Sequence, residues 1–373
     1  MVYISLLSFV LGSSMAQGQQ DSLKTLLNKH LPASQHLAVL EKLIDATRYE
    51  DRPQSLAYGK QAYRYTGQEN EPGIKAKGRE LLGIAFFANF EYDSALRYLK
   101  EGLDLADGVP QHNENIYWYI GEAFWFSGRF DSALVYHTKG QASALETKNL
   151  TLLATLTINI ADYYRQTGNF DKALDIYWEG IAYAMQDPSG SVLPKAYNNT
   201  ALLFGYLGDT YTELNYYFKA IEAAEKPGNG RFLGLFYANV AEAYTTLGDY
   251  PKALKYAAIG IEKSKATNQL RYLMSTYEMM GIMYLNMDSL AQARASFEES
   301  IRLNEQVKDK RFVARNLGNM GDLEKQVKNY PKAIRYYEEA IVAQDQIAEK
   351  KFKIEDLMGL AQTYFEQGNL AAA

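Results

Sequence analysis

Apolar, small and polar positions recur along this chain with a fixed period. In residues 237–260, YANVAEAYTTLGDYPKALKYAAIG, apolar side chains fall three and four residues apart before Gly248, and a second such run starts at Pro251. Spacings of three and four place these side chains on one face of a helix. The stretch therefore predicts two amphipathic helices joined by a turn at Gly248.

Two positions for small residues, twelve residues apart, mark each copy of this helix pair. The copies are 40 residues apart, except for one step of 38 residues between Ala95 and Ala133. A fixed period in this range predicts a solenoid of stacked helix pairs. In the second helix the position holds Ser55, Ala95, Ala133, Ala173, Glu213, Ala253, Ala293, Ala333 and Ala373. In the first helix it holds Leu43, Gly83, Gly121, Ala161, Ala201, Ala241, Gly281, Gly321 and Ala361.

Small side chains at these positions let the two helices of a pair approach closely. Glu213 breaks the pattern, so we expect a looser crossing there or a side chain that turns to solvent. The turn between the helices has its own register, because glycine recurs where a left-handed residue ends the first helix. Proline recurs in the first turn of the second helix, where a missing N–H is tolerated. These residues are Gly128, Gly168, Gly208, Gly248 and Gly368, and Pro53, Pro251 and Pro331.

The period divides the chain into a leader, a cap and nine repeats. We expect a leading helix within 17–33 and repeats near 34–70, 71–110, 111–149, 150–189, 190–229, 230–269, 270–309 and 310–349. The first repeat is atypical, as capping repeats of solenoids often are. A ninth repeat, 350–373, stops at Ala373 before its second helix is complete. We therefore expect the sequence to be a fragment of a longer protein.

The combination of these positions resembles the tetratricopeptide repeat. The resemblance covers roughly residues 34–373, with 40 residues per repeat as in the 40-residue variants of cell-polarity adaptors. It implies an all-α, right-handed superhelix of about nine helix pairs, whose concave face is lined by first helices and binds a peptide or a protein. The whole arrangement is similar to the extracytoplasmic region of Bacteroidetes-type sensor kinases and regulators. That likeness implies the sensory or interaction region of a larger signalling protein.

Asparagine recurs two residues before the small position of the first helix, at Asn159, Asn199, Asn239 and Asn319. Because asparagine is a poor helix former, its repetition in one register indicates a role. In tetratricopeptide proteins this position faces the groove, and the row resembles those that hold the main chain of an extended peptide. An amide can both donate and accept. The alternative is that each asparagine bonds a backbone group or a side chain of the next repeat.

Hydrogen bonds from this row would not suffice for tight binding. Four net hydrogen bonds contribute roughly 2–6 kcal/mol, whereas micromolar affinity needs about 8 kcal/mol. Other side chains expected on the same face could add the rest, although a solvated face is the alternative for each charge and core packing for Trp118. These candidates are Lys195, Arg315, Asp162, Arg165, Glu242, Asp322, Trp118 and Tyr119.

Composition excludes several classes of function. Net charge is −5 with no block of like charges, so nothing would neutralise the phosphates of a nucleic acid. The chain has no cysteine, which removes disulfides and thiolate chemistry. Its four histidines do not have the spacing of metal ligands, and neither a nucleophile-elbow nor a phosphate-loop motif occurs. The sequence predicts a binding protein without a cofactor or metal, and not an enzyme.

The first residues predict export. An apolar run at 2–11 and the small residues of Ser14-Met15-Ala16 favour a secretory signal cleaved after Ala16. No lysine or arginine precedes the run, and a buried first helix is the alternative. We expect a periplasmic protein that meets a membrane only through segments outside this chain. Two other interpretations stay open, a cytoplasmic peptide-receptor regulator of the quorum-sensing type and an assembly scaffold without a small ligand.

Overall fold

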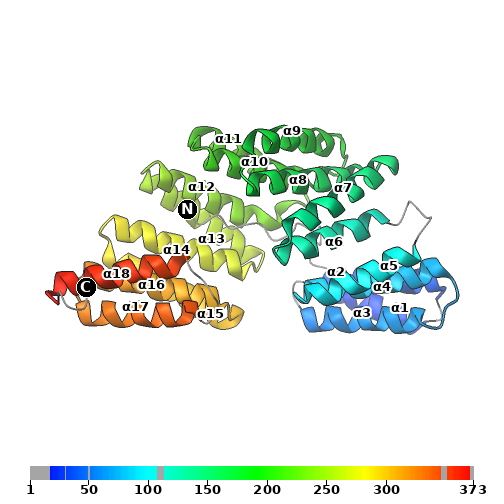
Figure 1. Ribbon diagram of the computed structural model, residues 1–373, viewed down its shortest axis with the longest axis horizontal. Helices are drawn as coiled ribbons and strands as arrows, with labels where there is room; N and C mark the ends of the chain where they lie inside the picture. The colour runs from blue at the N-terminus through cyan, green and yellow to red at the C-terminus, as the bar shows by residue number, and fades with distance from the viewer. Residues whose placement is uncertain (1–16, 30, 49–50, 107–112, 346–350, 370–373) are drawn as a thin grey trace. The chain divides into compact units, whose positions relative to one another are not determined.

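The computed structural model describes residues 17–29, 31–48, 51–106, 113–345 and 351–369. Within these residues all regular secondary structure is helical, and consecutive helices pair as antiparallel hairpins (Figure 1). This confirms the all-α solenoid of helix pairs. The expected signal segment, residues 1–16, and the final small position, Ala373, lie outside the described residues.

The chain forms two compact units, Met1–Leu207 and Gly208–Ala373. The first unit begins with the leading helix α1 (Gln17–Leu27). Its helix pairs are α2 (Ala33–Thr47) with α3 (Arg52–Thr66), α4 (Pro72–Ala88) with α5 (Tyr92–Leu105), α6 (Asn113–Phe126) with α7 (Phe130–Glu146), and α8 (Leu150–Gln166) with α9 (Phe170–Gln186); α10 (Leu193–Tyr206) ends the unit.

The second unit begins at α11 (Thr210–Ala224) and contains one short 3-10 helix, η2 (Gly230–Phe232). Its pairs are α12 (Leu233–Thr246) with α13 (Tyr250–Ala266), α14 (Leu270–Asn286) with α15 (Leu290–Val307), and α16 (Lys310–Gln326) with α17 (Tyr330–Asp345). The last described helix is α18 (Lys351–Gln367).

Within each unit the first helices of successive repeats lie side by side. In the first unit α4 contacts α6, α6 contacts α8 and α8 contacts α10; in the second α12 contacts α14, α14 contacts α16 and α16 contacts α18. Within a unit, an inner first helix such as α8 therefore touches its own second helix and the first helices before and after it. Side chains that recur in one register of these helices form a continuous row across the unit.

The turn inside each pair has the expected left-handed residue. All five glycines of that register have φ between 74° and 85°. Repeats without glycine still adopt the conformation, with Phe90, Asp288 and Lys328 at φ 65°, 57° and 61°. The following residue caps the second helix in several repeats: Asp249 accepts a hydrogen bond from the N–H of Lys252 at 3.2 Å. Such caps satisfy backbone donors that the helix leaves free.

The core consists of small and aromatic side chains between the helices of each pair. The small position is fully buried at Ala133, Ala173, Ala253, Ala293 and Ala333. Large buried rings of the second helix fill the space between the two helices of a pair. In four repeats the ring lies four residues after the small position, at Tyr177, Tyr217, Phe297 and Tyr337.

Glu213, the exception in the small position, does not turn to solvent. Its side chain is only 5 % exposed, which excludes one of the two expected alternatives; a looser crossing stays a prediction. Burial raises the pKa of its carboxyl to about 7, although the Tyr217 hydroxyl bonds it, and the nearby charge of Glu242 raises it further. A buried carboxyl without a cation holds its proton more tightly than the same group in water.

Replacing Glu213 by alanine should remove a pH dependence of stability. Between the ordinary pKa of 4.5 and about 7, the folded chain holds a proton that the unfolded chain releases, so stability falls as pH rises through this window. The stability of Glu213→Ala relative to the wild type should therefore rise by about 1–2 kcal/mol between pH 5 and pH 8. Melting temperatures at both pH values test this, with exposed Glu222→Ala as the control. Parallel pH profiles for wild type and Glu213→Ala would contradict it.

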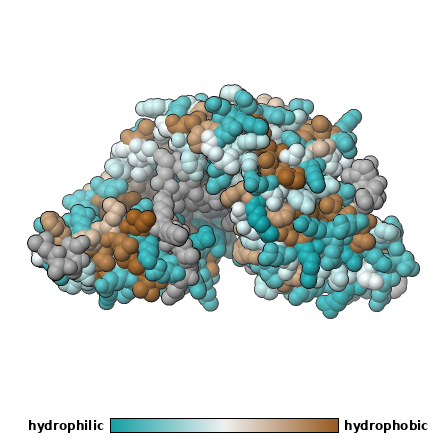
Figure 2. All heavy atoms as spheres, in the orientation of Figure 1, coloured by the Kyte–Doolittle hydropathy of each residue, from teal (hydrophilic) through white to brown (hydrophobic). Residues whose placement is uncertain are grey.

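The last described helix exposes apolar side chains. Ile354, Leu357, Met358 and Phe365 are between 44 % and 68 % exposed, and Figure 2 shows hydrophobic atoms at the surface in the region of α18. In earlier repeats the second helix covers the corresponding face of the first. No helix in the described part of the chain is long and apolar enough to span a membrane.

Candidate functional site

Three registers on the paired helices hold the polar groups of interest. The amide position of a first helix holds the asparagines, and the carboxyl position three residues later holds Glu122, Asp162, Glu242 and Asp322. The ring position lies 15 residues after the carboxyl position, on the second helix, and holds His137, Tyr177, Ala257 and Tyr337. The stacking of helices brings these registers of adjacent repeats together.

In the first unit, the amide of Asn159 joins two charged side chains from the neighbouring first helices. Its Nδ2 donates to Oε1 of Glu122 on α6 at 2.7 Å, and its Oδ1 accepts from Nζ of Lys195 on α10 at 2.7 Å. All three side chains are buried, with at most 5 % of each residue exposed. His137 Nε2 lies 3.4 Å from the same Glu122 oxygen. Asn159 thus connects three successive repeats.

One repeat further, Asp162 is the centre of a second network. Its oxygens accept from Nδ2 of Asn199 at 2.9 Å, from the Tyr177 hydroxyl at 2.5 Å and from NH2 of Arg165 at 3.2 Å. Arg165 also donates its Nε–H to the Tyr177 oxygen at 3.1 Å. Burial, and then the Asp162 charge, raises the pKa of Tyr177 well above its usual value. The hydroxyl therefore stays protonated and can donate.

These contacts place the predicted asparagines against protein groups. Asn159, Asn199 and Asn239 are 3–6 % exposed, and Asn319 is half-buried. The donors of Asn159, Asn199 and Asn319 bond carboxylates of preceding repeats. The alternative weighed from the sequence was a backbone group or a side chain of the next repeat. The carboxylates that these three amides bond lie in preceding repeats instead, and Asn159 also bonds Lys195 of the next repeat. A direct contact between this row and a peptide stays a prediction.

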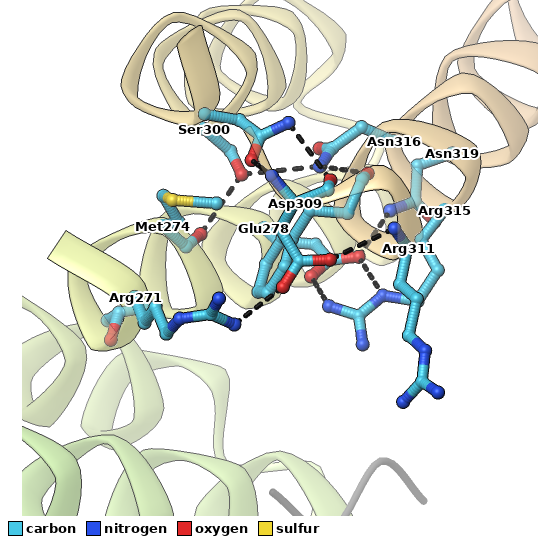
Figure 3. Close-up of polar contacts among 12 residues, drawn as sticks. Arg271, Met274, Glu278, Ser300, Asp309, Arg311, Arg315, Asn316 and Asn319 are labelled. Atoms are coloured by element: carbon cyan, nitrogen blue, oxygen red, sulfur yellow. Dashed lines mark hydrogen bonds and ion pairs between the residues drawn. The ribbon is translucent and has the colours of Figure 1, made fainter. Parts of the chain in front are cut away.

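In the second unit, Glu278 on α14 holds two of the predicted residues of α16. Its carboxylate accepts from Nε of Arg315 at 2.9 Å, from the Arg315 NH2 group, and from Nδ2 of Asn319 at 3.2 Å (Figure 3). The Arg315 guanidinium lies 4.5 Å from the centre of the Phe312 ring. Burial raises the pKa of Glu278, and the Arg315 charge opposes that shift. Arg315 is therefore part of a buried ion pair and not of a solvated face.

Two predicted residues of the third repeat belong to the core. Trp118 and Tyr119 are each 5 % exposed, and their rings lie 4.6 Å apart. The Tyr119 hydroxyl accepts a hydrogen bond from NH1 of Arg48 at 2.7 Å. Core packing, the alternative left open for Trp118, therefore describes its position, and the Tyr119 ring does not line an open surface either. Trp125 and Phe126 of the same helix are partly exposed, and sequence reasoning missed them.

A small recess opens beside the first-unit networks. It is lined by Glu122, Trp125, Phe126, His137, Asn159, Asp162 and Lys195, and its volume of about 20 Å³ holds about one water molecule. Trp125 and Phe126 are half-buried at this recess. Lys195 has its Asn159 bond, and no carboxylate of the described residues lies within 4 Å of its Nζ. Two of the three ammonium donors are thus available to an acceptor that enters the recess.

A larger recess of about 410 Å³ lies in the second unit, among the C-terminal ends of α14, α16 and α18. The predicted residue Asp322 lines it together with Lys325, Gln326 and Glu366. Asp322 is 49 % exposed and accepts from the Tyr337 hydroxyl at 2.6 Å. In the described part of the chain no group of three or more His, Asp or Glu side chains is placed to hold a metal ion.

Two of the carboxylates that bond the asparagines lie at a fixed distance along the sequence from their amide partners. Glu122 and Asn159, and likewise Asp162 and Asn199, are 37 residues apart, which is one repeat minus the three residues between the amide and carboxyl positions. Asn319 has Ile282 at that distance and bonds Glu278 instead. An acidic residue 37 positions before an asparagine therefore indicates an internal partner for the amide.

Comparison with known proteins adds a partial family match. Residues 272–346 match the tetratricopeptide repeat. No curated protein matches the chain. The matched segment covers most of α14 to α17, whose helix pairs share their registers with those of the preceding repeats. The family match and the structural neighbours below support a tetratricopeptide repeat protein.

Several solved structures share the fold. The apo form of the quorum sensor NprR from B. thuringiensis has a TM-score of 0.64 at 15 % identity, covering 88 % of this chain and 98 % of that chain. A Rap protein complexed with competence and sporulation factor has 0.61 at 15 %, covering 89 % and 92 %. The Rap conjugation gene regulator of plasmid pLS20, in complex with the Phr* peptide, has 0.55 at 12 %, covering 88 % and 94 %. At these identities the likeness concerns the fold.

Proposed function

We propose that the first-helix faces of this protein bind an extended peptide or a segment of a partner protein. The observation that carries the proposal is Lys195, a buried ammonium that lines the recess, bonds the Asn159 amide oxygen and has no carboxylate of the described residues within 4 Å of its Nζ. Buried charges in proteins are normally paired or fully hydrogen-bonded. An incompletely bonded ammonium next to an opening is therefore suited to an acceptor from a ligand, such as a main-chain carbonyl or a carboxylate.

The surroundings of Lys195 suit a peptide. Trp125 and Phe126 present half-buried rings at the edge of the same recess, and an apolar side chain that lies over its opening can pack against them. The networks around Asn159 and Asp162 fix the lining side chains before a ligand arrives, which lowers the entropy that binding loses. Structures with this fold include a Rap protein with competence and sporulation factor and a Rap regulator with the Phr* peptide. The Phr* peptide in the second of these structures supports a peptide as the ligand class.

Replacing Lys195 by methionine should weaken peptide binding about 10–100-fold, because a hydrogen bond to a charged group contributes about 1.5–3 kcal/mol. The ligand would come from a displayed library of random 12-residue peptides selected on the full chain, with affinities measured by calorimetry. Lys139→Met, the same change at an exposed position of α7, should leave affinity within about twofold.

Three results would count against this site. If Lys195→Met and Lys139→Met bind the peptide with equal affinity, the peptide does not bind at the recess. A circular dichroism spectrum that differs from the wild type would assign the loss to folding instead. Failure to select any peptide would favour an assembly scaffold that binds only folded partners.

The biological context is part of the same proposal. We take the chain to be a non-catalytic binding region of a larger exported signalling protein of the Bacteroidetes regulator type, without nucleic-acid contacts of its own. The apolar run at 2–11, the 40-residue repeats and the absence of catalytic motifs support it. A cytoplasmic peptide-receptor regulator is the alternative. Fractionation of the expressed full-length protein into periplasm and cytoplasm distinguishes the two.

A further inference from the structure

Three of the four acids in the carboxyl position are bonded by donors from their own protein. Asp162 accepts from the ring position, Tyr177, and from the next amide position, Asn199. Glu122 accepts from the next amide position, Asn159. Asp322 accepts from the ring position, Tyr337. The stacked repeats thus offer two standard donors to this register, and each of these acids uses at least one of them.

Glu242 on α12 has neither donor. Its ring position is Ala257 on α13, and the next amide position, 37 residues on, is Met279 on α14. Neither side chain can donate a hydrogen bond. No described donor bonds the Glu242 carboxyl, and no described lysine or arginine pairs with it. The side chain is half-buried, so one side of it remains open to solvent.

The surroundings of Glu242 are acidic and apolar. Burial raises the pKa of its carboxyl to about 7. Glu213 on α11 is close enough for the charge of Glu242 to raise its pKa as well. Partly buried Tyr244, Met279 and Met280 pack around the adjacent core cluster. A cation brought to this place would therefore pair with a poorly solvated carboxylate beside a second acid, where attraction is stronger than in water.

We propose that Glu242 receives a positively charged group of the bound peptide or protein segment, either a lysine or arginine side chain or a free N-terminal ammonium. The inference rests on the proposed function and specifies the ligand class for the face of the second unit. A ligand cation supplies at Glu242 the hydrogen bond that Tyr177, Tyr337, Asn159 and Asn199 supply to the other acids of the register. Nearby Met279 and Met280 can pack against the aliphatic part of a long basic side chain.

The test is parallel selection of a random 12-residue displayed library on the full-length wild type, on Glu242→Gln and on Glu262→Gln. Glutamine keeps the shape of the side chain and removes its charge, and Glu262 is an exposed glutamate of α13. Peptides selected on the wild type and on Glu262→Gln should carry a lysine or arginine at one position, or require a free N-terminus. Peptides selected on Glu242→Gln should lack this requirement.

Synthetic peptides then identify the source of the charge. Substituting norleucine for the basic residue, or acetylating the N-terminus, should weaken binding to the wild type about tenfold or more. The affinity of Glu242→Gln for the modified peptide should stay within about twofold of its affinity for the unmodified one. If norleucine weakens binding, a basic side chain contacts Glu242; if acetylation weakens binding, the N-terminal ammonium does.

Two outcomes overturn the inference in distinguishable ways. If the wild type and Glu242→Gln select the same peptides with the same basic residues, Glu242 does not receive the charge, while the proposed peptide-binding function stands. If no peptide is selected on any of the three proteins, the proposed function fails and the inference fails with it.

Discussion

Replacing Arg315 by methionine is expected to destabilise the second unit by about 3–5 kcal/mol. Arg315 is the cationic partner of Glu278, and their side chains are 15 % and 8 % exposed. Without the guanidinium, the Glu278 carboxyl keeps only the Asn319 amide and must either remain as a buried charge or take up a proton. Both alternatives carry a free-energy penalty, because the carboxyl is largely shielded from water.

Urea unfolding followed by circular dichroism measures this loss, and hydrogen exchange over α14 and α16 localises it. Localisation matters because a solenoid gains stability from neighbouring repeats and can unfold in parts. Arg311→Met, the same change at an exposed position of α16, should shift stability by less than about 0.5 kcal/mol. Replacing Glu278 by leucine as well should recover most of the loss, since an apolar pair can match a buried ion pair. A loss below about 1 kcal/mol for Arg315→Met would show that the pair is effectively solvated.

The second large effect is expected at Tyr177, whose ring is fully buried in the core of the first unit. Replacing it by alanine should destabilise α8 and α9 by about 3–5 kcal/mol, because the ring leaves a cavity. Replacing it by phenylalanine keeps the ring and removes only the hydroxyl that bonds Asp162 and Arg165. We expect Tyr177→Phe to lower the free energy of unfolding by about 1–3 kcal/mol. Urea unfolding of both variants separates packing from hydrogen bonding.

Tyr183→Phe is the matched control for the hydroxyl. Tyr183 lies on the same helix, and its hydroxyl donates to the side chain of Glu179 near the surface. Its removal should change stability by less than about 0.5 kcal/mol. Equal effects of Tyr177→Phe and Tyr183→Phe would show that the Asp162 network does not hold the repeats together. Ala257 occupies the same register in the sixth repeat, so the tyrosine is not required for a helix pair to form.

The architecture follows from local signals in the sequence. Gly248 and its equivalents adopt the left-handed conformation that ends the first helix, and Pro251 lies in the first turn of α13 as its register predicts. These features depend on residues within one repeat. Repetition of the same local signals predicts the stacking, because each amphipathic helix pair can bury its apolar face only against its neighbours.

The partners of the polar side chains were harder to predict. The asparagine register predicts that Asn199 lies on a first helix, as it does, but the partner of its amide, Asp162, lies in the preceding repeat. A carboxylate from a neighbouring helix and a peptide carbonyl can both accept from the same amide. The sequence alone could not decide between them, because the choice depends on distances across the stack.

For aromatic residues too, the sequence predicts the helix on which they lie but not whether they are buried. Trp118 and Trp125 lie on one helix, seven residues apart, and both suit a core or a surface. Trp118 is 5 % exposed, whereas Trp125 is half-buried and lines the recess beside Lys195. The difference arises from the neighbouring helices that cover each ring, which no local pattern records.

By itself, the sequence determined the helix pairs, their turns and the 40-residue period, because glycine, proline and small residues act through backbone conformation and close contact within a repeat. Only the tertiary structure decided which polar groups are already paired. It showed that Asn159 and Arg315 bond internal carboxylates, whereas Lys195 and Glu242 keep bonding capacity. The physical reason is that a hydrogen bond between repeats depends on the positions of two helices, and these are set by packing along the stack.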